Sequence, residues 1–144
     1  MGQQQLLLVI LVTILVGIAT VVAINTFGSS NVNANRDAVR NDVAAIATAA
    51  QAWYIKPEML GGGNNSFANL TFNDIGFAAD SIYNSGLTAA NLNGVYVLGT
   101  GTATSITVTA TPTSNVSADD AITITGTISP NNLSLAEAAV AATP

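Results

Sequence analysis

The amino-acid sequence predicts an α+β fold in which one long N-terminal helix packs on a small antiparallel β-sheet domain. Residues 6–24, LLLVILVTILVGIATVVAI, form a nearly continuous apolar run. Residues 36–56 repeat apolar side chains at helical spacing. Within residues 104–111 and 121–128, apolar residues, most of them β-branched, alternate mainly with Ser and Thr, which is the period of strands. We therefore expect a helix over residues 2–56 and a loop-rich β domain over residues 57–144.

The first half of this helix, residues 1–27, is apolar on every side. The sequence carries no charged side chain before residue 36. At about 1.5 Å per residue, residues 6–24 span roughly 28 Å, close to the hydrocarbon thickness of a bilayer. Thr13 and Thr20 are expected to bond to the carbonyl group one turn back, which makes them compatible with an apolar environment.

The second half of the helix, residues 28–56, is amphipathic, although residues 28–31, like Gly17 before them, are open to a bend. Apolar side chains then recur at intervals of four and three residues, which places them on one helical face. We expect this face to pack on the β domain, where the indole of Trp53 anchors the helix. The face consists of Val39, Val43, Ile46, Ala50 and Trp53. Pro57 ends the helix.

The β domain is expected to contain a three-stranded antiparallel meander with one face on the helix and a Thr-rich face pointing away. Its strands are residues 95–98, 104–111 and 121–128. Before them, the Thr71-x-x-Asp74 spacing predicts a single helical turn. After them, Ser134-x-x-Glu137 has the same capping-box spacing. Residues 130–144 are therefore read as a short helix, with an extended segment lying on a neighbouring molecule as the alternative.

Composition narrows the classes of function. Only three residues are basic and the net charge is −5, so the sequence lacks the basic stripe that a nucleic-acid-binding protein needs. It contains no Cys and no His, which removes thiolate chemistry and the usual general base. We therefore expect no enzyme and no cofactor, metal or nucleic-acid site.

Two further patterns in the sequence resemble a cation site and a glycosylation site. Asp119 and Asp120 are adjacent carboxylates, which supply too few ligands for a calcium shell, so a solvated turn is favoured. Four asparagines stand in the Asn-x-Ser/Thr pattern of N-glycosylation, which in so polar a chain is close to chance. These are Asn64, Asn69, Asn115 and Asn132.

An apolar helix with an internal glycine begins at Gln5-Leu6-Leu7-Leu8-Val9-Ile10 and continues into an amphipathic half. This pattern resembles the mature N-terminus of type IV pilins. The resemblance covers the whole expected helix. It implies that prepilin peptidase removes a leader and that Met1 is the mature, methylated terminus. A second register, with cleavage after Gly2, is the alternative.

A removed basic leader also resolves a conflict in charge placement. Arg36 and Arg40 follow the apolar run and, by the positive-inside rule, would otherwise keep the β domain in the cytoplasm. The neutral, hydroxyl-rich composition of that domain is more typical of secreted and surface proteins. A leader before Met1 reconciles the two observations.

Gln5 lies where bacterial members of the family carry a glutamate that pairs with the N-terminal amine of a neighbouring subunit. A carboxamide accepts a hydrogen bond but does not neutralise a charge, so the chain departs from the family at this contact. By resemblance, the side chains that pack between subunits come from the apolar half-helix. They are Gln5, Leu6, Leu7, Val9, Ile10, Ile14, Val16, Gly17 and Ile18.

These features predict a structural subunit of a type IV pilus-like extracellular filament that polymerises through its apolar helix. The resemblance implies surface attachment or motility as the role. It implies as partners further copies of the chain, the cytoplasmic membrane before assembly and the pilus assembly machinery. Two alternatives remain: a pseudopilin of a type II secretion-like system, and a single-pass membrane-anchored surface protein that does not polymerise.

Overall fold

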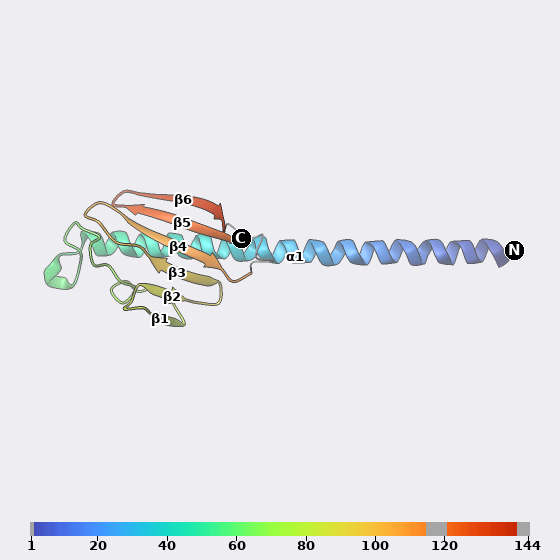
Figure 1. The fold of residues 1–144 in the computed structure, drawn as a ribbon, viewed down its shortest axis with the longest axis horizontal. Coiled ribbons are helices and arrows are strands. Elements are labelled where there is room, and N and C mark those ends of the chain that lie inside the picture. The colour runs from blue at the N-terminus through green and yellow to red at the C-terminus, as the bar shows by residue number, and fades with distance from the viewer. Residues whose placement is uncertain (1, 115–120, 141–144) are drawn as a thin grey trace. The chain divides into compact units, whose positions relative to one another are not determined.

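The computed structural model describes residues 2–114 and 121–140, and its contacts divide the chain into two compact units, residues 1–34 and 35–144. The described part of the first unit is helix alone, and the second unit combines the end of that helix with a β-sheet (Figure 1). Several sequence-based expectations fall outside the described residues. They concern Met1, Asn115, Asp119, Asp120 and residues 141–144.

Helix α1, Gly2–Ile55, is continuous, which confirms the helix expected over residues 2–56. Neither Gly17 nor Gly28 interrupts it. A Cβ atom at either glycine would meet no heavy atom within 4 Å beyond the helix's own backbone. Both glycines are therefore open positions on the surface of the single chain.

The segment after α1 folds back over Trp53. A short 3-10 helix, η1, Glu58–Leu60, ends at Gly61, which adopts the left-handed region with φ 76° and donates its N–H to the Glu58 carbonyl. Gly63 then approaches so closely that a Cβ atom there would lie 2.3 Å from the indole ring of Trp53. A side chain at Gly63 would displace the loop that covers this indole.

The second unit contains one six-stranded sheet in the order β1-β2-β3-β4-β5-β6, with every neighbouring pair antiparallel. The strands are β1, Ser81–Tyr83; β2, Thr88–Ala90; β3, Gly94–Leu98; β4, Ile106–Pro112; β5, Ile122–Ser129; and β6, Asn132–Ala139. The three strands expected from the sequence are β3, β4 and β5. The expected meander is thus the centre of a sheet with three more strands at its edges.

The expectation of a short helix within residues 130–144 is wrong for the described part of that segment. Asn132–Ala139 is strand β6, and all eight of its residues pair in register with β5, from Ser129↔Asn132 to Ile122↔Ala139. A tight turn at Pro130 and Asn131 joins the two strands. Pairing with the long β5 strand outweighs the helical propensity of an Ala-rich segment, since propensity is a weak prior.

The helical turn expected at Thr71 to Ile75 is also not formed. The segment is a hydrogen-bonded turn. Asp74 still folds back, because its carboxylate accepts hydrogen bonds from the Thr71 N–H at 3.0 Å and from the Thr71 hydroxyl at 2.7 Å. The predicted Thr–Asp contact therefore exists, but it closes a turn instead of starting a helix.

The core lies between the second half of α1 and one face of the sheet. The register carries one row of inward-facing residues across the sheet, from Ile82 through Tyr96 to Ile124 and Glu137. The intervening residues face away and include the Thr-rich positions of β4 and β5. The largest fully buried side chains of the core are Tyr96, Phe67, Phe72, Ile46, Leu70, Ile106, Ile124 and Ile128.

Candidate assembly surface

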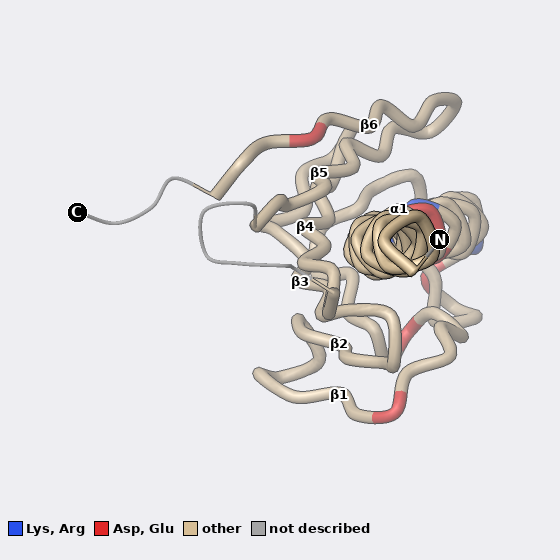
Figure 2. The backbone as a smooth tube through the Cα atoms, turned by 90° about the vertical axis from the view of Figure 1, so that its right-hand side faces the viewer, with Lys and Arg blue, Asp and Glu red and all other residues tan. Residues whose placement is uncertain are grey.

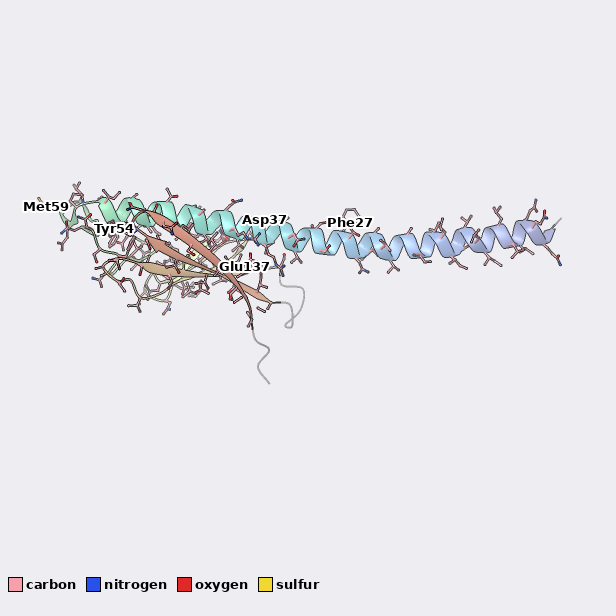
Figure 3. All side chains as sticks on the ribbon, turned by 90° about the horizontal axis from the view of Figure 1, so that it is seen from above. Phe27, Asp37, Tyr54, Met59 and Glu137 are labelled. Carbon is pink, nitrogen blue, oxygen red and sulfur yellow. The ribbon has the colours of Figure 1, made fainter. Side chains whose placement is uncertain are left out.

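The apolar side chains in the first half of α1 are exposed. Every large hydrophobic residue between Leu6 and Phe27 has at least 50% of its surface exposed, with the extremes at Val12 and Phe27, at 50% and 72%. Figure 3 shows side chains standing off the ribbon along this half of the helix, Phe27 among them. A soluble monomer rarely exposes a contiguous apolar patch of this size, so the surface indicates contact with lipid or with another protein.

Three threonines in this half of α1 satisfy their hydroxyl groups within the helix. The Oγ1 atoms of Thr13, Thr20 and Thr26 donate to the carbonyl groups of Val9, Val16 and Val22, at 2.5, 2.8 and 2.9 Å. The contacts expected for Thr13 and Thr20 are therefore present. No polar hydrogen of these side chains needs water, which suits the surface to an apolar environment.

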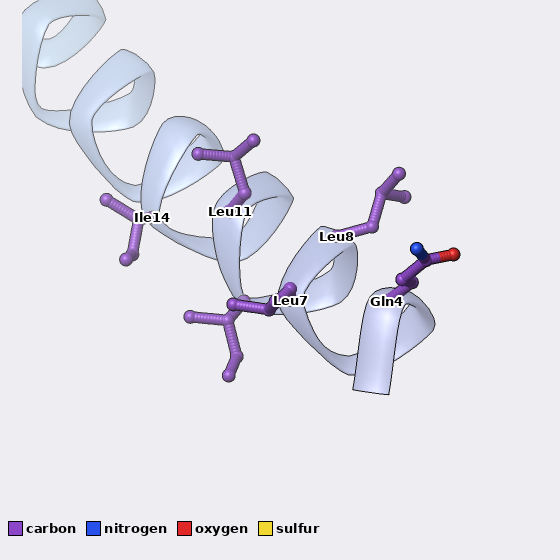
Figure 4. Close-up of a pocket in the computed structure, with 6 residues that line it drawn as sticks. Gln4, Leu7, Leu8, Leu11 and Ile14 are labelled. Carbon is purple, nitrogen blue, oxygen red and sulfur yellow. The ribbon is translucent and has the colours of Figure 1, made fainter. Parts of the chain in front are cut away.

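A shallow apolar hollow runs along the start of α1. It is lined by Gln4, Leu7, Leu8, Ile10, Leu11 and Ile14. Figure 4 shows the Leu and Ile side chains projecting from successive turns, with the carboxamide of Gln4 at the N-terminal end. Such ridges and hollows between turns accept the side chains of a second helix.

The side chains predicted to pack between subunits lie in this exposed half of α1. Gln5 is exposed on the first turn, and Gly17 presents bare backbone. Leu6, Leu7, Val9, Ile10, Ile14, Val16 and Ile18 are all among the exposed large hydrophobic residues. The single chain contains nothing in its described residues that covers them.

The length and composition of α1 allow it to cross a membrane. The most apolar window of the helix has none of its surface buried inside the chain. A core helix of a soluble protein can have the same length and hydropathy, but most of its surface is buried. The exposure of α1 distinguishes it from such a helix. A membrane anchor or a signal segment therefore both fit the N-terminal half.

The second half of α1 makes the opposite kind of surface, because it is buried against the sheet. The residues predicted to pack there, Val39, Val43, Ile46 and Ala50, are fully buried, and Trp53 is 9% exposed. Within the described residues, the indole Nε1 of Trp53 has no hydrogen-bond partner. Tyr54, the next residue, stacks on Phe67 with ring centroids 4.6 Å apart. This half of α1 belongs to the folded core.

A polar network centred on Asp42 was not predicted from the sequence. Its Oδ2 atom accepts hydrogen bonds from Asn91 Nδ2 at 3.0 Å, Asn93 Nδ2 at 2.8 Å and the Tyr96 hydroxyl at 2.5 Å. About two turns earlier on α1, Asn35 Nδ2 donates to the Asn93 carbonyl at 2.9 Å. These contacts attach the β2–β3 connection to the helix.

The network perturbs two ionisable groups. Partial burial raises the pKa of Asp42, but the hydrogen bonds from Asn93, Tyr96 and Asn91 outweigh burial and hold that pKa below its ordinary value. Burial, reinforced by the hydrogen bond to Asp42, raises the pKa of Tyr96 well above the ordinary value of a phenol. The pair is thus a carboxylate and a neutral phenol near neutral pH, which is a structural arrangement.

Arg40 connects α1 to the last strand. Its guanidinium forms ion pairs with Asp37 on the same helix and with Glu137 on β6. The hydrogen bond to Glu137 raises the pKa of Arg40, and the contact with Asp37 adds to this. Figure 3 labels Asp37 on α1 and Glu137 on β6, the two ion-pair partners of Arg40. The Asp37–Arg40 pair was expected from its spacing, but the longer-range pair to Glu137 was not.

No cluster of three or more Asp, Glu, His or Cys side chains that would hold a metal ion exists among the described residues. Charged residues are sparse along the tube in Figure 2, and the largest group of them in the described chain lies on α1, at Arg36, Asp37, Arg40 and Asp42. The arrangement in the described residues offers packing surfaces and structural polar contacts.

Comparison with protein-family models, with curated proteins and with solved structures finds no match to this chain. The architecture by itself, a long apolar N-terminal helix joined to an antiparallel sheet, is consistent with a pilin-like protein or a membrane-anchored surface protein.

Proposed function

We propose that the chain is the structural subunit of a type IV pilus-like extracellular filament. The observation that carries the proposal is the exposed, uncharged half of α1, which is too apolar to stay in water and is uncovered by the rest of the described chain. In this proposal the cytoplasmic membrane covers the segment before assembly, and copies of the same segment cover it afterwards. Surface attachment or motility is the role that such a filament serves.

Close packing between half-helices would supply the cohesion of the filament. Side chains such as Leu7 and Leu11 fit into the hollows between turns of a neighbouring helix, and Gly17 lets two backbones approach closely. Because Gln5 brings no charge, this cohesion depends on apolar packing and carboxamide hydrogen bonds. The prepilin peptidase, N-terminal methylation and the pilus assembly machinery belong to the same proposal.

The experiment is electron microscopy of material sheared from cells that produce the chain, with three variants. Val9→Lys and Val16→Lys each place a charge in the packed helices and should abolish filaments, because an unpaired charge in an apolar interior costs about 2.5–3.5 kcal/mol or more. Val9→Ile keeps the position apolar and should leave filaments in place. Membrane fractionation and protease resistance of the β domain check that the Lys variants still insert and fold.

The outcomes separate the candidate functions. Normal filaments from both Lys variants would contradict the packed-helix model. A wild-type chain that leaves the membrane only in detergent, and only as a monomer, supports the second candidate, a single-pass anchored surface protein, which the membrane-spanning length of α1 also favours. Short fibres confined to the periplasm would indicate a pseudopilin.

A further inference from the structure

The two edge strands of the sheet differ from each other. β1 has three residues and β6 has eight, and within the described residues β6 pairs on one side only, with β5. Figure 2 shows β1 and β6 at opposite ends of the sheet. An unpaired edge presents backbone N–H and C=O groups that another strand can bind. Neither edge contains Pro or Lys, which commonly protect such edges.

Both edges also leave apolar side chains uncovered on the face of the sheet that packs on α1. Ile82 on β1 belongs to the inward-facing row that contains the buried Tyr96, yet it is 39% exposed. Leu135 on β6 is paired opposite the buried Gly126 and faces the same way, yet it is 44% exposed. Each edge therefore combines an open backbone with an exposed aliphatic residue.

The topology makes the two edges complementary. The sheet is a meander of six strands joined by five antiparallel pairings, so β1 and β6 run in opposite directions. When two copies lie side by side with the same polarity, β6 of one copy meets β1 of the next as an antiparallel pair. The contact is head-to-tail, so it repeats from copy to copy instead of closing after two.

Charge does not oppose this pairing. The charged residue on β6, Glu137, is already paired with Arg40 of its own helix, and β1 itself carries no charge. By contrast, antiparallel pairing of β6 with β6 of another copy requires the two copies to have opposite polarity, which does not fit parallel α1 helices within one filament.

We propose that β6 of one subunit pairs with β1 of a neighbouring copy of this chain, which extends the sheet from subunit to subunit around the filament. Leu135 and Ile82 then lie on the same face of the joined sheet, where each covers the other. The inference rests on the proposed filament function, because it requires copies of equal polarity.

Disulfide cross-linking is the test, because the wild-type chain contains no Cys. Ser81→Cys on β1 is combined in turn with Ser134→Cys, Ala136→Cys or Ala138→Cys on β6. All four positions are exposed and point away from α1, as antiparallel partners in one sheet must. The three combinations cover different offsets between the strands. Filaments of each full-length variant are treated with a mild oxidant and dissolved in denaturant.

The expected result is a ladder of bands spaced by the 14.5 kDa mass of one chain for at least one combination. The matched control, Ser81→Cys with Leu135→Cys, places the second thiol on the opposite face of β6 and should leave monomers. Each single-Cys variant should also leave monomers, since a β6–β1 contact joins two different positions.

Three results would overturn the inference. The first is intact filaments with no ladder from any of the three combinations. The second is a ladder from the Leu135→Cys control that equals the best of them. The third is a dimer from Ala136→Cys alone, which would assign β6 to an isologous contact with another β6. Failure of the wild-type chain to form filaments would instead overturn the proposed function itself, so the two failures are distinguishable.

Discussion

The carboxylate of Asp42 on α1 accepts a hydrogen bond of 2.5 Å from the hydroxyl of Tyr96 on β3. Tyr96 is fully buried and its ring meets Phe77 edge-on, with centroids 5.2 Å apart. The hydroxyl group of a large buried aromatic side chain thus reaches helix α1, which packs on the sheet. Hydrogen bonds to a charged acceptor are stronger than those between neutral groups.

Tyr96→Phe removes only this hydroxyl. We expect the free energy of unfolding to fall by about 1.5–3 kcal/mol, because a partly buried hydrogen bond to a carboxylate is lost while the packing of the ring is kept. Chemical denaturation of the full-length chain in detergent measures the change. Tyr83→Phe, at an exposed edge position, is the matched control and should change it by less than about 0.5 kcal/mol. Equal effects at both positions would contradict the role given to the Asp42 contact.

The Asp42 carboxylate predicts a loss of stability in acid. Its pKa is lower in the folded chain than the ordinary value of 3.8, so the unfolded chain binds the proton more tightly. The contribution of this group is complete above the unfolded pKa, and it is lost as the pH falls through the folded one. The difference in denaturation midpoint between wild type and Asp42→Asn should therefore be largest near pH 6 and shrink below about pH 4. A constant difference across this range would exclude ionisation of Asp42 as its source.

Gly126 on β5 lies where the sheet packs closely on α1. A Cβ atom at this position would lie 2.7 Å from Val43 Cγ1 and 3.1 Å from Val108 Cγ1. Gly126→Ala should therefore lower the free energy of unfolding by about 1–3 kcal/mol through overpacking. Gly76→Ala, where a Cβ atom would meet nothing within 4 Å, is the control and should stay within about 0.5 kcal/mol.

A double-variant cycle tests the cause of that loss. If contact with Val43 produces the strain, Gly126→Ala combined with Val43→Ala should destabilise the chain by less than the sum of the two single variants. Strict additivity would indicate that the strain arises elsewhere, and the Val108 contact would then be the next to test.

The ion pair between Arg40 and Glu137 should contribute little to stability. Both side chains are exposed to about the same degree, 40% and 39%, so solvent screens their attraction. Glu137→Gln should lower the free energy of unfolding by less than about 1 kcal/mol at low salt, and 1 M salt should remove the difference. Glu58→Gln on the exposed η1 segment is the control. A loss above about 2 kcal/mol that persists in salt would show that the pair is more buried than its exposure indicates.

The sequence-based fold was most accurate where one pattern extended over many residues. The second half of α1 and strands β4 and β5 follow from periodicity, and the first half of α1 follows from an unbroken apolar run. Strands β1 and β2 have three residues each, too few for a period to appear. Strand β6 was predicted as a helix because its segment is rich in Ala and has a capping-box spacing. The alternation of Leu133, Leu135 and Glu137 with smaller residues, which is typical of a strand, is weak in such a segment.

The candidate site, too, could be predicted from the sequence only in part. Exposure of the apolar half of α1 follows from the sequence, because no other part of the chain is apolar enough to cover it. The Asp42 network does not, since Asn91, Asn93 and Tyr96 come within reach of Asp42 only after β2 and β3 have paired. A lone Asp on a polar helical face carries no sign of such partners.

The placement of the basic residues determines where trypsin-like proteases can cleave the chain. Trypsin-like proteases cut after Arg or Lys in locally extended segments. Arg36 and Arg40 lie inside α1, and Lys56 is followed by Pro57, a bond that these enzymes do not cleave. The folded chain therefore offers trypsin no accessible bond until the helix opens. Even after unfolding, complete digestion returns one long fragment that starts at residue 41 and contains every strand, so a standard tryptic mass-spectrometry survey of a cell surface would pass this protein over.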